Sequence, residues 1–416
     1  MEKYIINGGT RLFGEVPIIG AKNSVLPILA ATVINRSVNI ISNIPNLKDV
    51  DVMIKILTSL GAKVELDGDI LTVDSNLINS ISLPEELVRE MRSSIIFMGA
   101  LLARYGEAVL SYPGGCEIGP RPIDLHLKSL RQMGATIVES HGFIYCKADG
   151  LIGSDIQLDY PSVGATENIM LAAVTADGIT IIRNAAREPE IIDLQDYLNK
   201  AGCHVKGAGS SIIVIEGVKK LQACEHRIIP DRIVAGTYMV AAAVTKGEVV
   251  LKNIVVDHLQ SIIAKIKETG TKIIVDKNDI KIIGPEKINP IEMLQTLPFP
   301  GFPTDMQAQF MALLSIAGGT SIIYETVFEN RFKHAEELTR MGASIKTFGN
   351  VAVIKGVNEL TGAKVFAKDL RGGAALVLAG LIARGVTEVE NIYHVNRGYE
   401  NLYLNLQKLG ANIISV

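Results

Sequence analysis

Apolar residues follow three patterns along this chain, and each pattern predicts one kind of element. Between Val50 and Leu60, apolar residues recur at helical spacing on one face, which predicts an amphipathic helix. Residues 93–103 and 372–383 are small or apolar almost all round, which predicts buried helices. Short β-branched runs after a glycine, as in 178–182 and 319–323, predict strands. In order along the chain, these segments give a β-α-β-α-β-β succession.

A glycine phrase follows each amphipathic helix and occurs six times. The first copy is Leu60-Gly61-Ala62 and the last is Leu409-Gly410-Ala411. The glycines lie 68 to 73 residues apart, at positions 61, 134, 202, 270, 342 and 410. This near-constant period predicts six copies of one supersecondary unit, each helix ending at a C-cap glycine. Six units divide into two α/β domains of three, with the midpoint near Pro230, and we expect an active site in the cleft between the domains.

Composition narrows the class of protein. The 416 residues are 48% hydrophobic and carry a net charge of −3, which suits a globular protein and argues against a nucleic-acid or anionic-membrane surface. The four cysteines are widely spaced and form no CxxC pair. The N-terminus has no signal-peptide pattern, and the longest apolar runs are too short to span a bilayer. We therefore expect a soluble, reduced, cytoplasmic protein.

Cys116 lies in the segment with the most distinctive composition. Glycines and prolines crowd the stretch from Pro113 to Pro122, which excludes a helix or an interior strand and predicts a loop. A cation such as Arg121 lowers the pKa of a nearby thiol, and an exposed loop makes that thiol accessible. Cys116 is therefore a candidate reactive group, although an isolated loop cysteine can also be incidental.

Basic residues recur at equivalent places in the repeat. Helix N-termini expose unpaired N–H groups that favour anions, and we expect these positions to form one cationic pocket for phosphate or carboxylate groups. Solvated surface arginines are the alternative. The residues at the starts of the apolar helices are Lys22, Asn23, Arg92, Gly164, Asp305, Asp369 and Arg371, and those in the loops after the strands are Arg121, Arg187, Val327, Arg331 and Arg397.

Several common motifs are absent from the sequence. There is no GxxxxGK[ST] phosphate loop and no GxGxxG fingerprint, so neither a P-loop NTPase nor a Rossmann dehydrogenase is indicated. The seven histidines show no metal-binding spacing, and no GxSxG elbow occurs. We expect phosphate recognition by Arg, Lys and backbone N–H groups, with no cofactor and no metal.

The chain resembles the UDP-N-acetylglucosamine enolpyruvyl transferases of the EPSP synthase superfamily along its whole length. The motifs that carry the resemblance are Gly20-Ala21-Lys22-Asn23, Pro113-Gly114-Gly115-Cys116-x-Ile118-Gly119-x-Arg121-Pro122-x-Asp124-Leu125-His126, Ser162-Val163-Gly164-Ala165-Thr166, Phe302-Pro303-Thr304-Asp305-Met306-Gln307-Ala308-Gln309, Glu325-Thr326-Val327-Phe328-Glu329-Asn330-Arg331 and Arg397-Gly398-Tyr399-Glu400. The resemblance implies two inside-out α/β domains, each of three β-α-β-α-β-β repeats. The first would span 22–229 and carry the Cys116 loop as a lid, and the second would combine 1–21 with 230–416.

The resemblance also implies an activity. It is the transfer of the enolpyruvyl group from phosphoenolpyruvate to the 3′-hydroxyl of UDP-N-acetylglucosamine, with release of phosphate, by addition and elimination through a tetrahedral ketal. Cys116 would donate a proton to the methylene carbon, form a phospholactoyl adduct and be the site that fosfomycin alkylates. Asp305 would take the proton of the sugar hydroxyl. The residues implied for phosphoenolpyruvate are Lys22, Asn23, Arg121, Arg331, Arg371 and Arg397, of which Lys22 and Arg397 count as catalytic.

The implied sugar-nucleotide contacts lie in several loops and helix starts. They are Arg92, Arg121, Pro122, Ile123, Asp124, Leu125, Ser162, Val163, Gly164, Asp305 and the backbone of Val327. The chain departs from some family members in having Tyr160 where they have lysine.

Two other functions stay open from the sequence. One is a 3-phosphoshikimate enolpyruvyl transferase, which has the same fold and donor but lacks the Gly-Gly-Cys motif. The other is a catalytically silent protein that binds UDP-sugars. For the function that the resemblance implies, we expect phosphoenolpyruvate and UDP-N-acetylglucosamine as small-molecule partners, no nucleic-acid or membrane partner, and a monomer.

Overall fold

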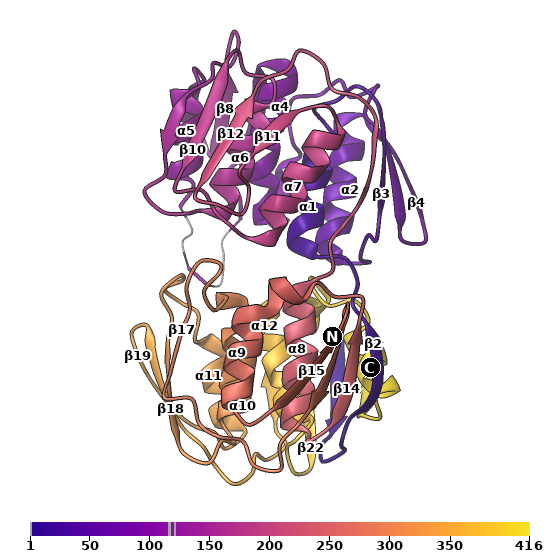
Figure 1. Cartoon of the computed structure of the whole chain (residues 1–416), viewed down its shortest axis with the longest axis vertical. Helices are drawn as coiled ribbons and strands as arrows, with labels where there is room; N and C mark the ends of the chain where they lie inside the picture. Colours follow the sequence, from indigo (N-terminus) through magenta and orange to yellow (C-terminus); the bar gives the residue numbers. More distant parts are fainter. Residues whose placement is uncertain (1, 115–117, 120–121) are drawn as a thin grey trace. The chain divides into compact units, whose positions relative to one another are not determined.

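The computed structural model describes residues 2–114, 118–119 and 122–416 and divides into two compact units. Unit 1 contains the chain up to Ile19, Ile118 and Gly119, and everything from Pro230 onward. Unit 2 contains the described residues of 20–114 and 122–229. Each unit has its own core cluster of buried apolar residues. In each unit, helices fill the interior and strands lie outside them (Figure 1).

Unit 2 contains three sheets and the helices between them. The sheet orders are β13-β3-β5-β4, β6-β8-β7 and β11-β12-β10-β9. Its strands are β3 (Val38–Ser42), β4 (Lys63–Asp67), β5 (Ile70–Asp74), β6 (Glu107–Ser111), β7 (Thr136–Ser140), β8 (Phe143–Lys147), β9 (Asp155–Gln157), β10 (Ile179–Arg183), β11 (His204–Lys206), β12 (Ile212–Glu216) and β13 (Cys224–Arg227). Its helices are α1 (Lys22–Ala31), α2 (Lys48–Leu60), α3 (Glu85–Glu90), the 3-10 helix η1 (Arg92–Ile96), α4 (Phe97–Tyr105), α5 (Asp124–Gln132), α6 (Val163–Ala173) and α7 (Pro189–Lys200).

Unit 1 repeats this plan. Its sheet orders are β15-β16-β14-β2, β17-β18-β20-β19 and β21-β22-β1-β23. The strands are β1 (Lys3–Asn7), β2 (Phe13–Pro17), β14 (Glu248–Lys252), β15 (Lys272–Asp276), β16 (Asp279–Ile283), β17 (Met293–Gln295), β18 (Thr320–Tyr324), β19 (Ser344–Phe348), β20 (Val351–Lys355), β21 (Lys364–Phe366), β22 (Val386–Glu390) and β23 (Asn412–Ser415). The helices are α8 (Arg232–Val244), η2 (Val256–Leu259), α9 (Gln260–Glu268), η3 (Thr304–Met306), α10 (Gln307–Leu314), α11 (Lys333–Arg340), α12 (Leu370–Gly380), α13 (Tyr393–Asn396) and α14 (Leu402–Lys408).

The N-terminal strands complete two sheets of unit 1. β2 pairs in parallel with β14, so that Phe13 lies opposite Glu248. β1 lies between β22 and β23 and is antiparallel to both. These pairings explain why the first 19 residues belong to the same unit as the C-terminal half.

The repeated glycines adopt the predicted conformation, and the apolar helices are buried, with one difference in helix type. All six glycines have a φ between 88° and 105°, the left-handed conformation of a residue that ends a helix. Every residue of α8 is buried, whereas α2 leaves Lys55, Thr58 and Ser59 exposed on one face. The expected helix over 93–103 is instead the 3-10 helix η1 followed by α4, and the Ser94 hydroxyl donates to the Met91 carbonyl at 2.7 Å before the α-helix starts. No helix among the described residues is long and apolar enough to cross a bilayer.

Candidate active site

Asp305 of unit 1 lies between two buried arginines. Arg331 Nη2 donates to Asp305 Oδ1 at 2.8 Å, and Arg371 donates to Oδ2 from Nε at 3.2 Å and from Nη2 at 3.0 Å. The arginine side chains are 4% and 3% exposed, whereas the Asp305 side chain is 26% exposed. The structure therefore brings together three of the predicted site residues, from η3, from the loop before α11 and from the first turn of α12. The carboxylate faces solvent more than the cations that hold it.

Helix capping fixes the place of Arg371. The Asp369 carboxylate accepts hydrogen bonds from the backbone N–H groups of Arg371 and Gly372, both at 2.9 Å, and so caps α12. Burial acts to lower the pKa of the Arg371 guanidinium, but the combined effects of Asp305, Tyr399 and Asp231, of which the Asp305 charge is the largest, outweigh burial and raise that pKa above its ordinary value. Arg371 Nη1 is buried and has no hydrogen-bond partner among the described residues. A buried N–H donor without an acceptor is a place where a ligand oxygen would be favourable.

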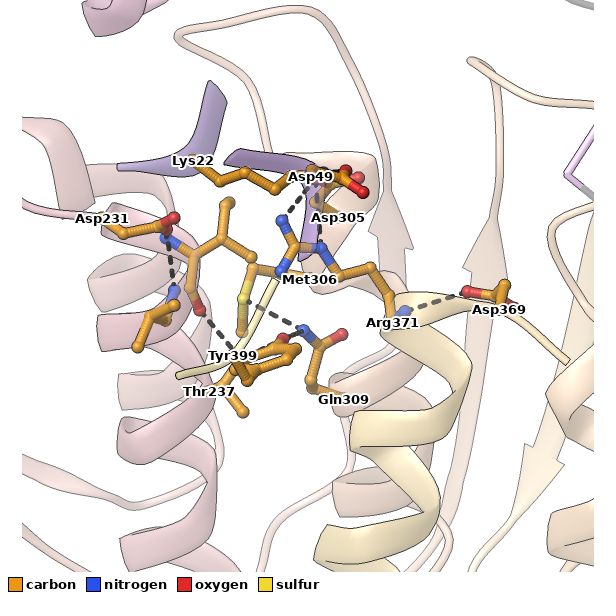
Figure 2. A network of polar contacts seen from close by, with 12 residues as sticks. Lys22, Asp49, Asp231, Thr237, Asp305, Met306, Gln309, Asp369, Arg371 and Tyr399 are labelled. Carbon is orange, nitrogen blue, oxygen red and sulfur yellow. Dashed lines mark hydrogen bonds and ion pairs between the residues drawn. The ribbon is translucent and has the colours of Figure 1, made fainter. Parts of the chain in front are cut away.

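A buried polar network supports Arg371 from below (Figure 2). The Arg371 guanidinium lies 5.4 Å from the ring centre of Tyr399. Gln309 Nε2 donates to the Tyr399 hydroxyl and to Thr237 Oγ1, both at 3.1 Å, and the two hydroxyls are 2.9 Å apart. Because the Thr237 hydroxyl donates to the Ile233 carbonyl at 2.8 Å, the Tyr399 hydroxyl must be the donor to Thr237. The network ties α8 and α10 to the segment that carries Arg397.

Arg397 follows α13 and is half-buried. Its neighbour Gly398 packs so closely on Leu370 that an added Cβ would come within 2.7 Å of that side chain. The Arg397 segment therefore lies against the first residue of α12, next to Arg371. Unit 1 thus gathers three of the arginines that the sequence predicts for phosphoenolpyruvate.

Lys22 and Asn23 begin α1 in unit 2, where the sequence places them. Lys22 Nζ forms an ion pair with Asp49 Oδ2 of α2 at 3.0 Å, and both side chains are largely buried. The next residue, Ser24, donates its hydroxyl to the buried Asp193, which also accepts from His226 Nε2 at 2.8 Å. The first turn of α1 is therefore fixed by polar contacts on two sides.

The predicted sugar-nucleotide residues of unit 2 lie at or next to the starts of η1, α5 and α6. One buried residue, Asn168 of α6, makes hydrogen bonds to the other two segments. Its amide nitrogen donates to the Ile95 carbonyl at 3.0 Å and to His126 Nδ1 at 2.9 Å, and its oxygen accepts from the Gly99 N–H at 2.6 Å. The His126 ring packs over Gly164, where an added Cβ would lie 3.1 Å from it. These contacts hold the segments that contain the predicted residues Arg92, Pro122, Ile123, Asp124, Leu125, Ser162, Val163 and Gly164.

The start of α6 is a regular N-cap. Ser162 Oγ accepts from the Ala165 N–H at 3.3 Å, and the Thr166 hydroxyl donates to the Ser162 carbonyl at 2.8 Å. Ser162, Val163 and Gly164 are half-buried, and Tyr160 is 42% exposed. The backbone at this helix start therefore remains accessible.

Cys116 and Arg121 lie outside the described residues. The described part of the same segment meets the loop that carries two predicted residues, because the Ile118 carbonyl accepts from the Asn330 N–H at 3.1 Å within unit 1. In that loop the Val327 N–H donates to Glu325 at 2.8 Å. A backbone contact of Val327 with a sugar nucleotide would therefore use its carbonyl oxygen.

The site residues that the sequence reasoning missed are supporting ones. Gln309, Tyr399, Glu325 and His126 lie inside the motifs quoted for the resemblance, but no pattern in the sequence assigns them a role. Asn168 lies in a helix that is apolar almost all round, and a polar residue at a buried position of such a helix is the signal that could have indicated it. Among the described residues, no cluster of three His, Cys, Asp or Glu side chains is arranged to hold a metal.

Comparison with known proteins places the chain in a family. A model of the EPSP synthase (3-phosphoshikimate 1-carboxyvinyltransferase) family matches residues 6–406. UDP-N-acetylglucosamine 1-carboxyvinyltransferase 2 of Caldanaerobacter subterraneus subsp. tengcongensis is 57% identical over 416 residues, all of both chains. UDP-N-acetylglucosamine 1-carboxyvinyltransferase 1 of Carboxydothermus hydrogenoformans is 54% identical over 99% of this chain and 98% of its own.

Solved structures agree with the predicted fold class. The enolpyruvyl transferase NikO from Streptomyces tendae has a TM-score of 0.91 at 26% identity, over 100% of this chain and 99% of its own. EPSP synthase from Acinetobacter baumannii has a TM-score of 0.79 at 18% identity over 100% of both chains, which concerns the fold alone. The prediction of an α/β enolpyruvyl-transferase fold is thus confirmed. The chain belongs to the EPSP synthase family and, within it, to the UDP-N-acetylglucosamine 1-carboxyvinyltransferases.

Proposed function

We propose that this chain transfers the enolpyruvyl group of phosphoenolpyruvate to the 3′-hydroxyl of UDP-N-acetylglucosamine and releases phosphate, the first committed step of peptidoglycan biosynthesis. The identity of 57% over the full length to a UDP-N-acetylglucosamine 1-carboxyvinyltransferase carries the choice of acceptor. A 3-phosphoshikimate acceptor is not favoured, because the EPSP synthase of Acinetobacter baumannii is only 18% identical to this chain.

The chemistry requires a proton at one carbon and an oxygen nucleophile at the next. In the addition step, the methylene carbon of phosphoenolpyruvate gains a proton, and the sugar oxygen forms a bond to the adjacent carbon as it loses its own proton. In the elimination step, the resulting ketal loses phosphate together with a proton from the new methyl group. An acid and a base placed on the two sides of the double bond are therefore needed.

We assign the base to Asp305. Its two oxygens accept hydrogen bonds from the side chains of Arg331 and Arg371. The side chain is 26% exposed, which leaves the carboxylate accessible to the sugar hydroxyl. The fixed cations hold the carboxylate in one orientation, which favours reaction over free rotation. The acid is assigned to Cys116 on the family resemblance.

Fixed cations also suit the other substrate. The phosphate and carboxylate of phosphoenolpyruvate carry negative charge that Lys22, Arg121, Arg331, Arg371 and Arg397 would neutralise. The buried Nη1 of Arg371 supports this assignment, because its N–H donors have no acceptor among the described residues and could bind a ligand oxygen.

Phosphate release tests the proposal. The purified chain is incubated with phosphoenolpyruvate and either UDP-N-acetylglucosamine or shikimate 3-phosphate, and phosphate is measured over time. We expect release with the UDP-sugar only. Phosphate release with shikimate 3-phosphate instead would show that this compound is the acceptor. Binding of the UDP-sugar without phosphate release from either pair of substrates would indicate a catalytically silent protein.

A further inference from the structure

Glu325 is a buried carboxylate to which the proposed reaction gives no role. It follows β18 directly, is 1% exposed and lies at the start of the segment that ends at Arg331. A charged group at such depth is costly unless several hydrogen bonds satisfy it.

Four donors satisfy this carboxylate. Oε1 accepts from the Thr296 hydroxyl and the Val327 N–H, both at 2.8 Å, and from the Phe328 N–H at 3.2 Å. Oε2 accepts from the Thr304 hydroxyl at 2.8 Å. Both carboxylate oxygens thus accept hydrogen bonds, three at Oε1 and one at Oε2.

These contacts connect Glu325 to the candidate base, Asp305, on two sides. Thr304 directly precedes Asp305 in η3. On the other side, the Phe328 ring lies 5.3 Å from the Arg331 guanidinium, which in turn donates to Asp305 at 2.8 Å. Glu325 therefore connects the segment that holds the carboxylate with the segment that holds its cation.

We propose that Glu325 is a positioning residue that fixes Asp305 and Arg331 relative to each other through Thr304 and the backbone of Phe328. The inference rests on the proposed function, because its effect is read out on the rate of enolpyruvyl transfer. A shift of the base by a fraction of an ångström changes the geometry of attack, and rates respond steeply to such shifts. The proposal requires no direct contact of Glu325 with Asp305 or with a substrate.

Thr304 allows a sharp test, because it is half-buried and its hydroxyl reaches Oε2 directly. Thr304→Val keeps the shape of the side chain and removes the donor, whereas Thr304→Ser keeps the donor. We expect Thr304→Val to lower kcat on the order of tenfold, with KM for UDP-N-acetylglucosamine nearly unchanged, and Thr304→Ser to retain most of the wild-type kcat.

A double-mutant cycle separates positioning from a merely structural role. If Thr304 acts through Asp305, then Thr304→Val should cause no further loss in an Asp305→Asn background. An equal loss in both backgrounds, an equal loss in the Ser and Val variants, or a wild-type kcat in Thr304→Val with only a lower Tm would each overturn the inference. Failure of the proposed function would appear elsewhere, as no phosphate release by the wild-type chain.

Discussion

Replacing Asp305 by asparagine tests whether one carboxylate both neutralises two buried arginines and serves as the base. The change keeps the size of the side chain and removes its charge. One amide oxygen can still accept from Arg331 or Arg371, but the amide nitrogen then faces the other guanidinium. Breaking a fully buried ion pair by removing one partner costs about 3–5 kcal/mol. Because the Asp305 side chain is 26% exposed, water replaces part of the lost interaction, and we expect unfolding to become easier by about 2–3 kcal/mol.

Urea unfolding followed by circular dichroism measures this loss, since the chain has no tryptophan for fluorescence. Asp276→Asn is the matched control, because Asp276 is exposed on β15 of the same unit. The control should change the free energy of unfolding by less than about 0.5 kcal/mol. In the kinetic assay, Asp305→Asn should lower kcat by a factor on the order of 10²–10⁴ without weakening phosphoenolpyruvate binding, because the arginines remain. An unchanged stability would refute the ion-pair argument, and an unchanged kcat would refute the role as base.

Three further predictions concern other parts of the site. Cys116→Ser should abolish or greatly weaken turnover because a hydroxyl is a much weaker acid than a thiol, while Cys116→Asp should keep activity and escape fosfomycin alkylation; wild-type turnover by the serine variant would contradict the proton-donor role. Lys22→Ala should weaken phosphoenolpyruvate binding by about 1.5–3 kcal/mol and UDP-N-acetylglucosamine binding less, measured by titration calorimetry, and the reverse order would contradict the assignment. Burial, with a smaller contribution from the Arg331 charge, lowers the pKa of His334 from 6.5 to about 4. The unfolded chain therefore binds a proton that the folded chain does not between these pH values, so stability should be complete above pH 6.5 and fall by roughly 3 kcal/mol towards pH 4. His334→Leu should remove this part of the pH dependence in urea unfolding, whereas replacing the exposed His141 by asparagine should not; parallel curves for all three proteins would contradict the prediction.

Local patterns predicted the repeat and most of the helices. The glycine of each repeated phrase requires a positive φ, which few other residues adopt, so Gly61 and its five counterparts could be identified from the sequence. Helices that are apolar all round, such as α8, must be buried wherever they pack. Because the repeat also shows where each apolar helix begins, Lys22, Arg92, Asp305 and Arg371 could be placed at or near helix starts, where the structure has them.

Contacts between distant segments could not be predicted in this way. The pairing of Phe13 with Glu248 depends on the return of the N-terminal strands to unit 1, which no local pattern encodes. The two arginines on Asp305 come from 26 and 66 residues further along the chain. Which of several arginines meets that carboxylate is decided by how the helices pack. The sequence could therefore place Asp305 among the candidate site residues, but it could not predict the contacts of Glu325 with Thr304 and with the backbone of Phe328.

A nuclear magnetic resonance spectrum of the product formed in D₂O tests whether this chain transfers the enolpyruvyl group by addition and elimination. Phosphoenolpyruvate and UDP-N-acetylglucosamine are incubated with the wild-type chain, and the sugar nucleotide is observed without purification. Addition followed by elimination predicts a vinyl ether at the 3′-oxygen with deuterium in its methylene group, because the carbon is protonated by the solvent-exchanged acid before it loses a proton again. An unchanged sugar nucleotide would contradict the proposed transfer, and a vinyl ether whose methylene carries no deuterium would contradict the addition and elimination steps.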